Sequence, residues 1–183
     1  MARGVRPSRP GRGERRSGDR TLRLIAMDDV TLARAIHVLA VIHWFGGVAF
    51  VTAVILPAVA AIAEPANRLA LFEAIEGRFS AQVRVSVPLA GLSGFYMGER
   101  LDAWDRFLDP AGWWLIAMVL VWLLFMAILF IVEPLLLRRW FHRRAASDPD
   151  GTFRLVQRAH WGLTAIGAVT AAGGVLGAHG FLG

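Results

Sequence analysis

The chain has 183 residues, 56% of them hydrophobic, and a formal net charge of +6 at pH 7. A mean hydropathy of +0.50 and long blocks of apolar residues exclude an ordinary soluble globular protein and indicate a helical membrane protein. The chain contains no cysteine, which excludes disulfides, iron–sulfur clusters and thiolate metal sites.

The positive charge is concentrated at the N-terminus. Residues 1–26 carry eight arginines against Glu14 and Asp19, a net charge of +6, so residues 27–183 sum to zero. The high isoelectric point therefore does not indicate nucleic-acid binding, because the excess lies in one tail rich in glycine, proline and serine. We expect residues 1–26 to form a disordered arginine-rich tail, with Met27 as an alternative start, and residues 27–183 to form the membrane domain.

Four apolar segments predict the fold. They cover about residues 30–61, 80–98, 113–137 and 160–181. A membrane-spanning helix needs about 20 apolar residues, and the second segment is the weakest because it contains Gln82, Arg84 and Pro88. The fourth is rich in glycine and alanine, which permit close helix packing. The fold class predicted is all-α: an integral membrane four-helix bundle with up-down topology.

The connections between these segments indicate orientation. Residues 64–78 have the apolar spacing of an amphipathic helix, which either lies on the membrane surface or extends the second span. Residues 138–158 are strongly basic, with a turn signal at 147–151. Because arginines gather in these two connections, the positive-inside rule places them in the cytoplasm and both termini outside it if the chain starts at Met27. The arginines of residues 1–26, where they are present, favour the opposite orientation. The location expected is a bacterial inner membrane, crossed several times.

Histidines within the apolar segments are the candidate cofactor ligands. Imidazole is a common ligand of haem iron, and ionisable side chains at membrane depth usually mark a site. In an up-down bundle His37 and His179 lie near the same membrane face, so they are the preferred pair of metal ligands for a b-type haem. His43 with His179, or His160 as the second ligand, are the alternatives. All four residues also have a structural interpretation as hydrogen-bonding side chains.

Charged residues near the histidines complete the predicted site. Arg34 and Arg100 are expected on the His37 face and are the candidate partners of the haem propionates, since arginine pairs well with carboxylates. Arg84 belongs to the opposite end of the bundle. We expect Glu133 to pair with Arg84 or Arg138 in a structural role.

The first segment reads His37-Val-Leu-Ala-Val-Ile-His43-Trp44-Phe45-Gly46-Gly47. It resembles the first helix of the CopD/HemJ-like family of small bacterial membrane proteins, which groups copper-resistance D domains with the HemJ-type protoporphyrinogen oxidase. The resemblance places His37 on the haem-associated histidine of that family and makes His43 an addition. It covers the first span well and the four-span layout loosely, and it implies haem or copper as the bound group.

The leading prediction is a haem-b-binding membrane protein with a redox or haem-handling role. A copper-handling CopD-like protein is the first alternative, although soft ligands for Cu(I) are scarce here. A non-catalytic membrane subunit with structural histidines is the second. The partners expected are the lipid bilayer and either a redox partner or further copies of the chain, with no nucleic acid. Whether the chain is an enzyme stays open.

Overall fold

The computed structural model describes residues 12–181, with side chains from Asp29 onward except those of residues 136–139. The all-α prediction is confirmed, since the described residues form helices and short connections and contain no strand. The elements in order are α1 (Arg12–Phe50), η1 (Val51–Ile55), α2 (Leu56–Ile62), α3 (Pro65–Arg100), η2 (Trp104–Phe107), η3 (Pro110–Gly112), α4 (Trp113–Ala127), η4 (Ile128–Leu137), α5 (Arg138–Ser147) and α6 (Pro149–Ala178).

Three stretches within the described residues are long and apolar enough to cross a membrane: Asp29–Ile62, Pro110–Leu135 and Pro149–Ala178. They correspond to the first, third and fourth predicted segments. The fourth begins earlier than predicted, because Asp148 caps α6 by accepting a 2.8 Å hydrogen bond from the backbone N–H of Gly151. The weak second segment lies in α3, which is helical throughout but is not one of the three.

The amphipathic stretch at residues 64–78 is continuous with the second segment, so of the two predicted arrangements the structure has the extension. Pro65 occupies the first turn of α3, where the missing N–H is harmless. Leu69 and Phe72 from this first half are buried in a core shared with Leu56, Val59 and α6. The first two turns of α3 therefore pack against the protein, and they join the second apolar segment as one continuous helix.

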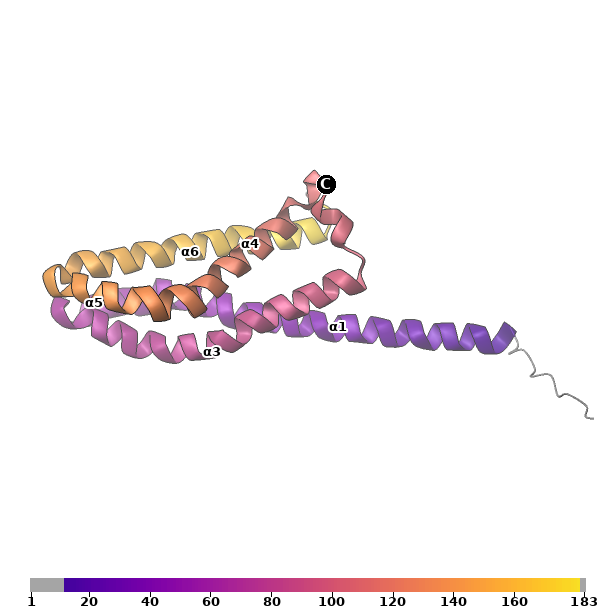
Figure 1. The fold of residues 1–183 in the computed structure, drawn as a ribbon, viewed down its shortest axis with the longest axis horizontal. Helices are drawn as coiled ribbons and strands as arrows, with labels where there is room; N and C mark the ends of the chain where they lie inside the picture. Colours follow the sequence, from indigo (N-terminus) through magenta and orange to yellow (C-terminus); the bar gives the residue numbers. More distant parts are fainter. Residues whose placement is uncertain (1–11, 182–183) are drawn as a thin grey trace, which may run out of the picture.

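The long helices lie side by side (Figure 1). α1 packs most extensively on α3, α3 contacts α4, α4 packs on α6, and α6 returns to α1. The α2–α3 and α5–α6 junctions meet at one end, where Arg68 donates a 2.8 Å hydrogen bond to Asp150. The other end holds the α3–α4 connection, the end of α6 and the point where α1 leaves the other helices (Figure 1).

α1 begins at Arg12, so residues 12–26 are helical where the sequence predicts disorder. Arginine is a good helix former, and these residues extend the apolar helix that follows without a break. Residues 1–11, the rest of the predicted disordered tail, lie outside the described residues. In Figure 1 this part of α1 projects beyond the other helices.

Candidate functional site

His37 is half-buried on the side of α1 that faces α3. Its Nδ1 lies 2.8 Å from the carbonyl oxygen of Ala90 and 3.3 Å from Oγ of Ser93. Because a carbonyl oxygen only accepts, Nδ1 carries the hydrogen, and Nε2 of the neutral ring keeps its lone pair. Gly94 makes room for the ring, since a Cβ there would stand 3.3 Å from Cε1 of His37. Thus α3 sets both the orientation and the tautomer of this imidazole.

His43 points to a different part of α3, and its side chain is exposed. Its Nδ1 is 3.1 Å from Oγ of Ser86, and its Nε2 is 3.3 Å from Oε1 of Gln82. The consistent assignment for a neutral ring is that Ser86 donates to Nδ1 and that Nε2–H donates to Gln82. Both ring nitrogens are then engaged, so His43 has no lone pair free for a metal in this arrangement.

His179 is the C-cap residue of α6. Gly180 has a φ of +74°, and the N–H groups of Gly180 and Phe181 bond the carbonyls of Gly177 and Leu176 at 3.1 and 3.0 Å, which is the Schellman arrangement that terminates many helices. The exposed His179 ring donates from Nδ1 to the carbonyl of Val175 at 2.8 Å. As in His37, this leaves Nε2 with its lone pair.

His160 lies about three turns into α6 and does not begin it, because α6 starts at Pro149. Its Nδ1 donates to the carbonyl of Val156 at 3.0 Å, and its ring packs edge-on against Phe72 with 5.4 Å between the ring centroids. It is 19 residues from His179, about 28 Å along the helix axis. One haem therefore cannot take both His160 and His179 as ligands.

The predicted propionate partners lie where α1 meets the end of α3. Arg34 is exposed on α1. Arg100 is engaged already, because it donates a 2.8 Å hydrogen bond to Oδ2 of Asp29. The hydroxyl of Tyr96 donates to the same oxygen at 2.9 Å. Asp29, which the sequence analysis did not single out, thus organises this end of the helix pair.

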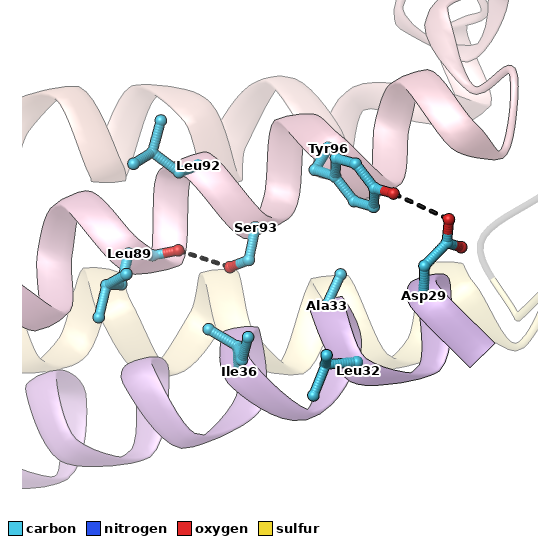
Figure 2. A pocket seen from close by; sticks show the side chains of 8 residues that line it. All are labelled: Asp29, Leu32, Ala33, Ile36, Leu89, Leu92, Ser93 and Tyr96. Atoms are coloured by element: carbon cyan, nitrogen blue, oxygen red, sulfur yellow. Dashed lines mark hydrogen bonds between the residues drawn. The ribbon is translucent and has the colours of Figure 1, made fainter. Parts of the chain in front are cut away.

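An open hollow of about 360 Å³ lies between α1 and α3 beside this ion pair. Figure 2 shows Leu32 and Ile36 on one side, Leu89 and Leu92 on the other, and the Asp29–Tyr96 hydrogen bond at one end. Ser93 also lines it, with its hydroxyl donated to the carbonyl of Leu89 at 2.6 Å. The walls are otherwise apolar, so the hollow suits hydrocarbon.

Glu133 pairs with Arg84, one of the two partners expected for it. The Arg84 guanidinium lies 3.2 Å from Oε1 of Glu133, and the buried Ser80 hydroxyl donates to Oε2 at 2.9 Å. The Glu133 side chain is only 13% exposed, and Pro134 follows it in η4. Both carboxylate oxygens have partners, as a structural role requires.

The candidate ligands lie on two helices, His37 and His43 on α1 and His160 and His179 in and at the end of α6, and they do not form one cluster. Among the residues described, no hydrogen bond or ring contact joins two of the four histidines, and no three His, Cys, Asp or Glu side chains are grouped to hold a metal ion. Sequence reasoning missed Ser86 and Ser93, the α3 hydroxyls beside His43 and His37. Serine is common in small-residue helices, so nothing in the sequence distinguished these two.

Comparisons with known proteins yield no relative for the chain. No family model matches the sequence, and neither a curated protein nor a solved structure matches it. The resemblance of the first span to the CopD/HemJ-like family therefore stays a prediction.

Proposed function

We propose that the chain is an integral four-helix membrane protein of a bacterial inner membrane that binds haem b and has a redox or haem-handling role. The membrane part of the proposal is supported by the outer surface of the helices. In Pro110–Leu135, and again in Pro149–Ala178, only 11% of the 18-residue apolar stretch is buried inside the protein. Soluble monomers rarely expose apolar surface on this scale, whereas a bilayer covers it.

α3 completes the bundle as its fourth helix, although it is the least apolar. It lies between α1 and α4, and its Arg84 is neutralised by Glu133. An ion pair and close neighbours reduce the cost of charged side chains at membrane depth. Successive long helices run in opposite directions between the two ends of the molecule (Figure 1), which agrees with up-down topology.

The observation that carries the haem proposal is the geometry of His37. Metal-ligating histidines usually donate their other ring N–H to a carbonyl or carboxylate, which fixes the tautomer. His37 donates Nδ1–H to Ala90 and keeps Nε2 for a ligand. Its position is about 12 Å along α1 from Asp29, at a depth where an unused imidazole is costly.

His179 is the proposed second ligand because it has the same tautomer and lies at the same end of the bundle. Asp29 joins the start of the first span to the end of α3, and a Cβ at Gly177 of α6 would meet the Trp114 indole at the start of α4. Since α3 and α4 are joined by residues 101–112, these contacts gather at one end. Arg34 is the proposed propionate partner. When bound, haem supplies one-electron transfer through its iron.

The test is the absorption spectrum of the purified full-length protein, oxidised and dithionite-reduced, after expression with ample haem. We expect a sharp α-band on reduction, as bis-histidine b haem gives, and its loss in His37→Ala and in His179→Ala. The matched control is His142→Ala, because this histidine is 61% exposed on α5 beside Glu73. Circular dichroism and gel filtration verify that each variant is folded.

A well-folded wild-type protein without colour would overturn the haem proposal, and copper analysis of the same sample then tests the alternative metal. If the spectrum is lost in His43→Ala or His160→Ala while His179→Ala keeps it, haem binding stands but the second ligand is wrong.

A further inference from the structure

We infer that the outer face of the α1–α3 pair is the surface on which two copies of this chain associate within the bilayer, with Gln82 at its centre. This inference rests on the membrane integration proposed above and does not depend on haem. The face is formed by two stripes of exposed residues, Leu32, Leu39, His43, Gly46 and Phe50 on α1 and Gln82, Val85, Leu89 and Leu92 on α3.

The first reason is that polar groups on this face lie deep in the membrane. His43 is 14 residues after Asp29 on α1, and Gln82 is 14 residues before Tyr96 on α3, which is about 21 Å along each helix. The Asp29–Tyr96 hydrogen bond marks one end of the pair. The hydrocarbon core is about 30 Å thick, so the His43–Ser86–Gln82 cluster lies inside it, and the His43 and Gln82 side chains are exposed.

The second reason is the hydrogen-bonding capacity that the cluster leaves unused. Ser86 donates to His43, and His43 donates to Oε1 of Gln82. The Gln82 amide donates one hydrogen to the carbonyl of Arg78 over a long 3.4 Å. An amide has two N–H donors and two acceptor lone pairs, so Gln82 keeps one donor and one acceptor site, and lipid can satisfy neither.

The third reason is that the missing partner is chemically the same group. An amide presents a donor and an acceptor side by side, so a second Gln82 related by a two-fold axis supplies the complement of the first. Self-complementary two-fold contacts are the commonest arrangement in homo-oligomers. Polar side chains within an otherwise apolar surface are also a usual means of joining membrane helices.

The shape of the face permits close approach. Gly46 has no other group within 4 Å of the position that a Cβ would take, so a helix from a second copy can approach α1 there. Beside it, the hollow between Leu32 and Ile36 on α1 and Leu89 and Leu92 on α3 is open (Figure 2). Apolar side chains of the second copy fit this hollow, and the surrounding residues are equally apolar, with Leu39 67% and Val85 62% exposed.

The experiment counts the copies of the full-length protein in each lipid nanodisc by single-molecule photobleaching. It also measures the mass of the protein in mild detergent by light scattering. Incorporation into nanodiscs verifies membrane integration independently of association. We expect a dimer that Gln82→Leu weakens about tenfold. Gly46→Leu should abolish it by filling the contact. Its matched control is Gly162→Leu, because Gly162 on α6 also has nothing within 4 Å of a Cβ, and that variant should stay dimeric.

A cysteine-free chain allows a second measurement that does not depend on Gln82. Oxidation of membranes should cross-link Val85→Cys, which lies one turn from Gln82, and should not cross-link Leu120→Cys, which is 60% exposed on α4. A monomer in nanodiscs, or a dimer that Gly46→Leu and Gln82→Leu leave intact, would overturn the inference. If the protein is monomeric and still shows the haem spectrum, the dimer inference fails and the proposed function stands.

Discussion

Glu133 illustrates how a single carboxylate is accommodated within an apolar segment. It lies in η4 between residues that are otherwise hydrophobic, and its two oxygens are met by Arg84 and Ser80 from α3. The buried Ser80 donor and the ion pair together replace the hydration that the carboxylate loses. These contacts therefore fix the position of the third apolar segment along the axis of α3.

At this scale we expect Glu133→Ala to lower the free energy of unfolding by about 1–3 kcal/mol, because it leaves Ser80 and Arg84 without their partner. We count the ion-pair part as the smaller one, because the Arg84 side chain is 39% exposed at the protein surface. Thermal unfolding in detergent measures the change. The double variant Arg84→Met/Glu133→Leu should recover part of the loss, and a double variant less stable than Glu133→Ala would contradict this account.

At the scale of elements, glycines decide where helices touch. A Cβ at Gly91 of α3 would collide with the indole of Trp122 on α4, whose Nε1 donates to the carbonyl of Val87 at 2.8 Å. Gly91 therefore lets Trp122 lie flat against α3 and reach its acceptor. The same helix supplies Gly94 beside His37, so two glycines one turn apart make room for the Trp122 indole and for the candidate ligand.

We expect Gly91→Ala to destabilise the protein by about 1–3 kcal/mol, because the added methyl forces the indole to move and weakens its hydrogen bond. Gly162→Ala is the matched control, since its Cβ meets nothing within 4 Å. It should be neutral or stabilising by up to about 1 kcal/mol through helix propensity. Tryptophan fluorescence during denaturation follows both variants, and equal effects would show that backbone propensity, not the Trp122 contact, governs position 91.

At the scale of the whole molecule, the basic connections share one end. The α2–α3 and α5–α6 junctions meet through Arg68 and Asp150, and the arginines of residues 138–158 flank the second junction in the sequence. Exposed Trp140, stacked under the Arg144 guanidinium at 5.6 Å, has the amphipathic character of an interfacial anchor. We therefore predict that this end lies in the cytoplasm.

The orientation predicts that a reporter fused after Gly183 lies outside the cytoplasm. We expect an alkaline phosphatase fusion at this position to be active and a green fluorescent protein fusion to be dark, whereas insertions of the same reporters at Ser147 should behave in the opposite way. A fluorescent C-terminal fusion would reverse the assignment. The result is independent of haem and of self-association.

Much of the helical organisation could be predicted because it depends on local patterns. Runs of apolar residues give the all-α fold and three candidate spans, and the turn signal at 147–151 coincides with the Asp148 cap. The choice of Arg84 over Arg138 for Glu133 was left open and needed the register of two helices. The helical state of residues 12–26 was missed, because composition alone did not reveal that they continue an apolar helix.

What the sequence determined by itself is the helix content, the apolar segments and the set of ionisable residues within them, since each follows from residue type and near-neighbour spacing. Only the tertiary structure decided the partners. It placed His37 on Ala90, His43 on Gln82 and Arg100 on Asp29. These contacts join residues 39 to 71 positions apart, and they depend on how α1 and α3 are rotated and shifted against each other. Packing of many side chains sets that register, and no short stretch of sequence encodes it.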